Sequence, residues 1–244
     1  MIPARVPRVL RMGPARLTAG LDHCRRLDLP AHRTLHGLVE PRELGELISY
    51  ANEVDMRGRG GAAFPFARKL RAVADSAGTG ESVVLVNGAE GEPASSKDAM
   101  LLTRNPHLVL DGAVLAAEAL GAREVVVATA GGEVAEASVA AAVAERRAAN
   151  VSGGAESRVP IRVVGIKERF ISGEGGALVR AVNGEEGIPP GRKKRAAQSG
   201  VDGLPTLLSN TETYAQFALL AEYGPPRSTR KWAPPRSPAR SCSP

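Results

Sequence analysis

The chain contains few aromatic residues and almost no cysteine. Aromatic side chains make up 3% of its 244 residues, and Cys24 and Cys242 are its two cysteines. Two cysteines near opposite ends exclude a disulfide framework and a four-cysteine iron–sulfur or zinc site within one chain. No run of about 18 apolar residues is available to cross a membrane, and the Arg-rich start lacks the continuous apolar region of a signal peptide. We expect a cytoplasmic protein without direct membrane insertion.

The basic residues are concentrated at the two ends. The formal net charge is +6, but residues 1–36 and 225–244 each carry +5, whereas residues 37–224 carry −4. No aromatic platform of the kind that stacks on nucleic-acid bases is interleaved with this terminal charge. We therefore expect no nucleic-acid partner, with binding through the basic ends as the weaker alternative.

Three short aliphatic runs predict strands that are buried on both faces. These runs are Val83–Val86, Glu124–Thr129 and Ile161–Gly165. Helices are predicted at 41–51, at 106–120 between an Asn105 cap and Gly121, and at 133–149. The alternation indicates an α/β fold, a Rossmann-like parallel sheet flanked by helices. In such sheets the ligand lies beyond the carboxyl ends of the strands.

Glycine-rich and polar loops are placed to form that site. GRGGAAFP, residues 58–65, combines an arginine with N–H groups that an anion can approach closely, although an ordinary turn also fits it. NGAEGEP follows the first predicted strand, and SGEGGAL follows the third after some six residues. In the former loop, Asn87 offers an amide to a planar heterocycle, and Glu90 and Glu92 offer oxygens to ribityl or ribose hydroxyls. A solvated acidic turn is the alternative for each loop.

Several separated motifs resemble the flavin-binding subunit of respiratory complex I in their order and rough spacing. They are GRGGAAFP, Lys69, VLVNGAEGEP with Lys97-Asp98, NPHLVLDG, SGEGGAL and LPTLLSNTET. Residues 38–223 thus resemble the FMN domain of the 51 kDa flavoprotein family, which is also found in NAD-linked formate dehydrogenases and hydrogenases. In that family NADH passes a hydride to FMN, which hands electrons singly to iron–sulfur clusters.

The resemblance implies which residues bind the cofactor. The expected FMN residues are Gly58, Arg59, Gly60, Gly61, Lys69, Asn87, Glu90, Gly173, Glu174, Asn210 and Thr213. Phe64 and Glu92 are expected beside the nicotinamide nucleotide, with a core position as the alternative for Phe64. FMN carries the chemistry, so we expect no catalytic side chain and no metal site. The four histidines are scattered, and His107, at a helix start, is expected at the surface.

Three positions depart from the family pattern. Ala89 replaces an acidic residue, Gly175 replaces the second of two glutamates, which in the family faces NADH, and Ser209 replaces the first Asn of a pair. We expect FMN binding to lose some contacts and NADH binding to be affected more.

The family's full-length chain continues into a ubiquitin-like region and a Cys-rich iron–sulfur domain, which we do not find here. Residues 225–244 instead contain six Pro, four Arg and four Ser, a composition typical of disorder. We interpret the chain as a basic N-terminal segment (1–37), an FMN-binding α/β domain (38–224) and a disordered tail (225–244), truncated or frame-shifted, without an iron–sulfur cluster.

The resemblance predicts a flavoprotein oxidoreductase. FMN would take a hydride from NAD(P)H and pass electrons to a separate iron–sulfur or ferredoxin-type partner. Such a protein is cytoplasmic, or peripheral to a membrane through partner subunits. The alternative is a non-catalytic, truncated FMN-binding remnant or an assembly protein.

Overall fold

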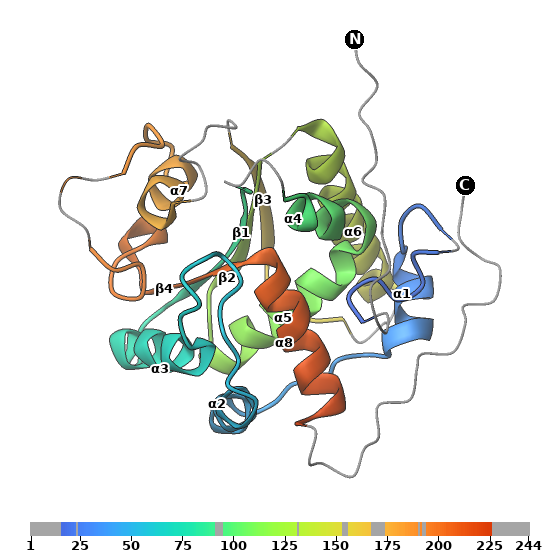
Figure 1. Ribbon diagram of the computed structural model, residues 1–244, viewed down its shortest axis with the longest axis horizontal. Helices are drawn as coiled ribbons and strands as arrows, with labels where there is room; N and C mark the ends of the chain where they lie inside the picture. Colours follow the sequence, from blue (N-terminus) through green and yellow to red (C-terminus); the bar gives the residue numbers. More distant parts are fainter. Residues whose placement is uncertain are drawn as a thin grey trace.

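A four-stranded parallel sheet lies at the centre of the protein (Figure 1). The computed structural model describes residues 16–22, 24–90, 95–130, 132–152, 156–166, 174–189, 191 and 194–225. The strands are β1 (Val83–Gly88), β2 (Glu124–Thr129), β3 (Ile161–Gly165) and β4 (Thr206–Asn210). The helices are α1 (Leu29–His36), α2 (Leu44–Glu53), α3 (Phe66–Ala77), α4 (Lys97–Arg104), α5 (Pro106–Leu120), α6 (Glu133–Val151), α7 (Gly175–Val182), the 3₁₀ helix η1 (Val201–Gly203) and α8 (Thr211–Tyr223). The predicted Rossmann-like α/β fold is confirmed.

The strand order β3-β2-β1-β4 creates a switch point beside β1. From β1 the chain passes through α4 and α5 to β2, and through α6 to β3. It then returns to the other side of β1, where β4 pairs in parallel and aligns Asn87 with Asn210. In open α/β sheets, ligands bind at the carboxyl ends of the strands where the chain changes direction in this way.

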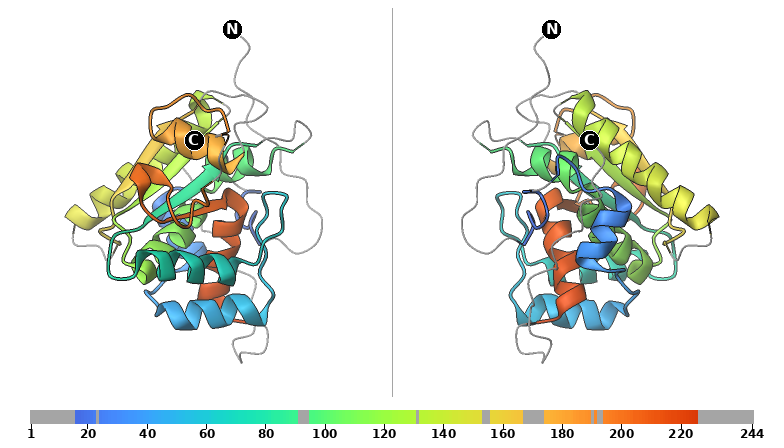
Figure 2. Two further views of the ribbon diagram at one scale, coloured as in Figure 1. Left: turned by 90° about the vertical axis from the view of Figure 1, so that its left-hand side faces the viewer. Right: turned by 90° about the vertical axis from the view of Figure 1, so that its right-hand side faces the viewer.

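The two faces of the sheet are covered unequally. Alternate side chains such as Val84, Val127 and Leu207 pack into a large core with α2, α3, α5, α6 and α8. The opposite face, with Leu85 and Val126, is covered by α7 and η1. Figure 2 shows α7 on the other side of the sheet from α2 and α3. No helix in the described ranges is long and apolar enough to span a bilayer.

The sequence predicted some boundaries well and others poorly. β2, β3 and α5 begin and end where expected, and Gly121 ends α5 in the left-handed conformation, with φ 61°. The predicted helix at 41–51 instead begins at Leu44. Asn105 makes no side-chain cap bond: its amide nitrogen donates to the carbonyl of Leu17, and its Oδ1 has no hydrogen-bond partner among the described residues. The sequence patterns do not predict β4, α1, α3, α4 or α7.

Buried ion pairs fasten α1 to α5 and α6. Asp111 on α5 accepts hydrogen bonds from His32 at 2.7 Å and from Arg146 on α6 at 2.5 Å. Burial alone would raise the pKa of Asp111, but Arg146, His32 and Arg33 hold it well below its usual value.

His107 is fully buried and bonded to Glu145 at 2.8 Å, so the expected surface position of His107 is wrong. Its Nδ1 atom accepts a hydrogen bond from Arg146 Nε at 3.2 Å, so the imidazole bridges Arg146 and Glu145 in the interior.

Gly112 permits the close approach of α5 to α8. A methyl group at this position would overlap the carbonyl oxygen of Tyr214. Gly112→Ala is therefore expected to lower the free energy of unfolding by about 3 kcal/mol, the upper end of the usual cost of adding a methyl group to a well-packed core. Gly45→Ala on α2 is the control, because nothing lies within 4 Å of its added methyl group, and it is expected to be neutral or mildly stabilising. Urea unfolding measures both, and equal stabilities would contradict the close contact.

The buried histidines predict a loss of stability in mild acid. Burial lowers the pKa of His36 to about 3 and that of His107 to about 4, from a usual 6.5. The unfolded chain therefore binds protons first, and the free energy of unfolding falls as the pH drops below about 6.5. Each histidine contributes a loss of about 2 kcal/mol by about pH 5. Measurements are kept above pH 5 so that the titration of Glu145, whose pKa is lowered from 4.5 to about 2, does not contribute to the change.

His36→Leu tests this origin. Among the described residues neither ring nitrogen of His36 has a hydrogen-bond partner, so the variant removes a titrating group without breaking a bond. Urea unfolding at several pH values is expected to give a shallower decline than in the unmodified chain. An unchanged pH dependence would assign the acid sensitivity to other groups.

Candidate functional site

The carboxyl ends of β1 and β4 bring the predicted amides together. Asn87 and Asn210 occupy paired positions, and Thr211 Oγ1 donates to the carbonyl of Asn87 at 3.0 Å. Asn87 Oδ1 accepts from the N–H of Ala89 at 3.0 Å, which turns the chain away from the strand. A methyl group at Gly88 would lie 2.6 Å from the carbonyl oxygen of Ala128, so this tight strand end requires glycine.

Three helices begin around this edge of the sheet, and predicted site residues bond to the N–H groups at their starts. Asn210 Oδ1 accepts from Glu212 N on α8 at 3.0 Å, and Glu174 Oε2 accepts from Ala177 N on α7 at 2.9 Å. Glu90 Oε1 accepts from Lys97 N on α4 at 3.0 Å, an unexpected capping role for this side chain. Helix N-termini carry partial positive charge and favour anions nearby.

The glycine loop closes on itself and lies against α8. Gly58 N donates to the carbonyl of Phe64 at 2.9 Å, and Gly61 adopts φ 93°, which favours glycine. Arg59 N donates to Thr213 Oγ1 at 3.0 Å. A methyl group at Gly60 would lie 3.6 Å from Asn210 Cβ, so the loop adjoins the start of α8. Among the described residues, the N–H groups of Gly60 and Gly61 have no hydrogen-bond acceptor.

Two lysines enter the site from different helices. Lys69 on α3 donates from Nζ to the carbonyl of Leu208 on β4 at 2.8 Å, and burial lowers the pKa of Lys69. Lys97 at the start of α4 donates from Nζ to Asn210 Oδ1 at 2.9 Å. The resemblance predicts Lys69 as a site residue, whereas Lys97 and its neighbour Asp98 are only part of a matching motif. Their position directly after a strand-end loop is the signal that would have identified them.

Glu212 lies between two cations at the start of α8. Its carboxylate is 3.5 Å from Lys97 Nζ and 3.9 Å from Arg59 Nε, and Glu212 Oε1 accepts from Gln216 Nε2 at 2.7 Å. An internal anion therefore lies where the helix dipole and two side-chain cations favour negative charge.

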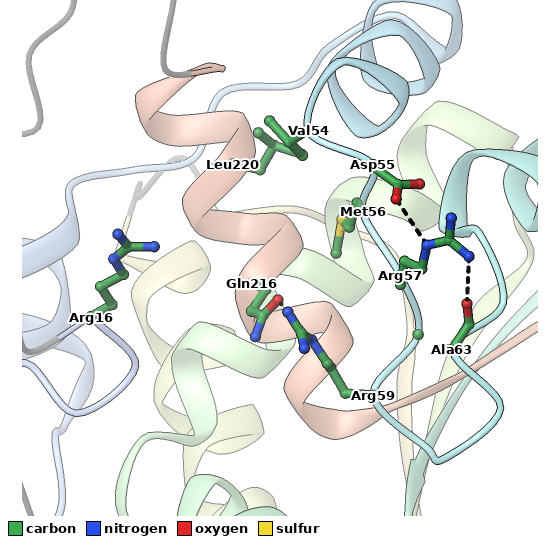
Figure 3. A pocket seen from close by; sticks show the side chains of 10 residues that line it. Arg16, Val54, Asp55, Met56, Arg57, Arg59, Ala63, Gln216 and Leu220 are labelled. Carbon is green, nitrogen blue, oxygen red and sulfur yellow. Dashed lines mark hydrogen bonds and ion pairs between the residues drawn. The ribbon is translucent and has the colours of Figure 1, made fainter. Parts of the chain in front are cut away.

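A pocket of about 410 Å³ opens beside the glycine loop. Figure 3 shows Gln216 and Leu220 of α8 beside it, and Arg57 bonded to Asp55 at 3.0 Å. Arg16, Val54, Met56, Gly58, Arg59 and Ala63 complete the lining. The pocket adjoins Arg59, and among the described residues its lining includes none from the loops that follow β1 and β3.

The remaining predicted residues lie at the rim of the site or outside the described part of the chain. Phe64 is 42% exposed, with the Arg68 guanidinium 5.4 Å from its ring centroid, so the alternative of a core position is wrong. Gly173 and Glu92 fall outside the described residues. Gly175 begins α7, and a methyl group there would lie 3.7 Å from Leu208.

The donors present suit a flavin mononucleotide. N–H groups of the glycine loop, two cations and the start of α8 fit a phosphate, whereas Asn87 and Lys69 offer groups to a polar heterocycle. Ser209 Oγ is buried without a hydrogen-bond partner among the described residues. Within the same part of the chain, no group of three or more His, Cys, Asp or Glu side chains is arranged to hold a metal ion.

The chain is similar in sequence to a known domain family and to subunits of larger enzymes. Residues 51–218 match the profile of the Nuo51 FMN-binding domain. A subunit of the NADH-quinone oxidoreductase of Aquifex aeolicus is 29% identical over 184 residues, which are 73% of this chain and 43% of the relative. The alpha subunit of NAD-reducing hydrogenase HoxS of Cupriavidus necator is 32% identical over 197 residues, 77% of this chain and 31% of the relative. The chain thus spans less than half the length of either relative.

A solved structure gives a similar result. The crystal structure of an NAD+-reducing NiFe-hydrogenase in the H2-reduced state aligns with a TM-score of 0.69 at 28% identity. The alignment covers 86% of this chain and 35% of that one. The likeness therefore extends beyond the glycine loop to most of the chain.

Glu212→Gln is expected to strengthen binding of FMN relative to riboflavin, which lacks the phosphate. The variant keeps an oxygen for Gln216 but removes the negative charge beside Lys97 and Arg59. A Coulomb interaction of about 1 kcal/mol in water corresponds to a gain of roughly fivefold. Fluorescence titration of both flavins measures the ratio of their dissociation constants.

Glu81→Gln is the control for this change. It removes the same charge from the residue two positions before β1, at the opposite edge of the sheet. The control is expected to leave the ratio unchanged. Equal changes for FMN and riboflavin in Glu212→Gln would show that Glu212 does not face the phosphate.

Proposed function

The chain belongs to the Nuo51 FMN-binding domain family, and we propose on this basis that it is a flavoprotein that binds FMN and oxidises NAD(P)H. When bound, FMN supplies the redox chemistry by accepting a hydride and releasing electrons singly. The observation that carries the proposal is the pairing of Asn87 with Asn210 where the chain changes direction, surrounded by the starts of α4, α7 and α8.

The phosphate end of the cofactor is assigned to the start of α8. Gly60 and Gly61 offer N–H groups there, while Arg59 and Lys97 supply positive charge. Thr213 holds the loop in place through the main chain of Arg59. Backbone donors and a helix N-terminus contact the phosphate alone. They therefore anchor that end of the cofactor, and other residues contact its ring.

The ring end is assigned to the loops that follow β1 and β3. Asn87 fixes the start of one loop, and Glu174 fixes the start of α7. Lys69 brings a donor from α3 beside β4, and its lowered pKa reflects a partly desolvated ammonium group. A cation near a flavin ring stabilises negative charge that develops on reduction, which is the electrostatic role we assign to Lys69.

The nicotinamide nucleotide is assigned to the exposed side of the glycine loop. Phe64 presents an aromatic face there, and the Arg68 guanidinium lies over it. Gly175 leaves the start of α7 without a side chain, in place of the glutamate expected from the family. Stacking therefore carries a larger share of nucleotide recognition in this chain.

The electron acceptor is assigned to a separate iron–sulfur or ferredoxin-type protein. This chain covers 43% of one relative named above and 31% of the other, and the match does not include the rest of either protein. Both are named as subunits of larger oxidoreductases. A partner must approach the carboxyl ends of the strands, because the amino ends of the strands are remote from the proposed flavin.

The purified chain, reconstituted with FMN, is expected to bind the flavin near stoichiometry and to lose visible flavin absorbance when NADH or NADPH is added without oxygen. The absorbance is expected to return with an artificial electron acceptor. Bound FMN that dithionite bleaches but neither nucleotide does would contradict the oxidation of NAD(P)H and leave flavin binding intact.

Phe64→Ala separates nucleotide binding from flavin binding in the same assay. Loss of an aromatic stack worth about 0.5–1.5 kcal/mol is expected to raise the KM for the nucleotide by roughly twofold to tenfold, with FMN content unchanged. Leu38→Ala is the matched control, because Leu38 is 43% exposed and Phe64 is 42% exposed. An equal effect of both variants would remove Phe64 from the nucleotide site.

A further inference from the structure

Asp98 is a buried carboxylate at the start of α4 to which the family resemblance gives no role. Its side chain is 2% exposed, and burial raises its pKa, an effect that Lys97 and Asn210 partly offset. A buried charge of this kind is costly unless it is paired and hydrogen-bonded. The position of its partners therefore indicates what the carboxylate does.

Asp98, Lys97 and Asn210 form a closed ring of hydrogen bonds. Asn210 Nδ2 donates to Asp98 Oδ2 at 2.6 Å, and Lys97 Nζ donates to Asp98 Oδ1 at 3.0 Å. Lys97 Nζ also donates to Asn210 Oδ1 at 2.9 Å, which closes the ring. Each member is thus bonded to both others, and moving one of them breaks two bonds.

The ring determines which way the Asn210 amide points. Asn210 Oδ1 already accepts from Lys97 Nζ and from the N–H of Glu212, while Nδ2 donates to a group that only accepts when ionised. Rotating the amide by half a turn would set oxygen against the Asp98 carboxylate and set N–H groups against the donors of Lys97 and α8. The Asp98 carboxylate and the two donors to Oδ1 therefore select the same orientation.

The ring also aims the Lys97 ammonium. An ammonium group has three hydrogens, and Lys97 Nζ donates to Asp98 at 3.0 Å and to Asn210 at 2.9 Å. Its third polar contact is an ion pair with Glu212 at 3.5 Å. The longest of the three contacts is the one to Glu212, at the start of α8. An incoming phosphate can replace that partner while the two ring bonds hold the ammonium in place.

We propose that Asp98 is a positioning residue for the cofactor phosphate, acting through Lys97 and Asn210 at the start of α8. The inference rests on the proposed binding of FMN and adds the group that orients its phosphate site. Asp98 lies behind these two side chains and does not itself contact the ligand, because a carboxylate would repel the phosphate.

The test compares FMN with riboflavin in Asp98→Asn. The variant retains the side-chain size but removes the charge that orients Lys97 and Asn210. FMN affinity is expected to fall about tenfold, as for loss of a charged hydrogen bond, while riboflavin affinity changes less than about threefold. A general loss of structure would weaken both flavins equally, and equal weakening would overturn the proposal. Asp75→Asn, on the exposed face of α3, is the control and should change neither affinity.

A second variant keeps the test decisive if Asp98→Asn fails to fold. In Lys97→Gln the cation is absent, so Asp98→Asn added to it leaves no unpaired ammonium. The double variant is expected to have the same FMN-to-riboflavin ratio as Lys97→Gln within about twofold, since both changes interrupt one ring. A further large loss in the double variant would show that Asp98 does not act through Lys97.

The outcomes also separate this inference from the proposed function. An unmodified chain that binds neither flavin would overturn both. An unmodified chain that binds FMN more tightly than riboflavin, with the same preference in Asp98→Asn, would overturn the positioning role alone. Far-ultraviolet circular dichroism on each variant confirms that the compared proteins are folded.

Discussion

The parallel pairing of β1 with β4 is the contact on which the candidate site depends. It joins segments far apart in the sequence and sets Asn87 beside Asn210. The chain cannot form this edge by local folding, because β4 follows β2 and β3 in the sequence and yet pairs with β1. Thr211 adds a side-chain bond to the carbonyl of Asn87 at the same place. The starts of α4, α7 and α8 are positioned around the edge as a consequence.

Polar residues at this edge hold the structure and present the site at the same time. Glu90, Glu174 and Asn210 each satisfy N–H groups at the start of a helix. A side chain that caps a helix has a fixed position, because moving it exposes unpaired N–H groups. The site therefore consists of groups fixed by the fold before any ligand arrives, which reduces the entropy lost on binding. Flexible surface side chains would not provide this arrangement.

The sequence predicted the parts of the fold that local patterns encode. β2, β3 and α5 were placed correctly, because continuous aliphatic runs and a left-handed glycine are local signals. β4 was missed, since five residues reading TLLSN become a strand only beside β1. The resemblance named Asn210 and Glu90 but not their capping roles, and it gave no role to Asp98. His107 was misplaced because its neutral, buried state depends on Glu145 and Arg146, which no local pattern connects to it.

The charges of the site are already neutralised within the chain, and this constrains how an anion can bind. Lys97 is paired with Asp98, and Arg59 and Lys97 both approach Glu212. An incoming phosphate therefore exchanges one anionic partner for another and does not meet free cations. Such an exchange yields little net Coulomb energy, so the affinity for the cofactor must come from the arrangement of the hydrogen-bond donors. A small anion can contact only part of that arrangement. The ring around Asp98 preserves that geometry during the exchange, because its bonds do not involve Glu212. Discrimination between a flavin phosphate and a simple anion then follows from the fixed spacing between the α8 end of the site and the groups beside β1.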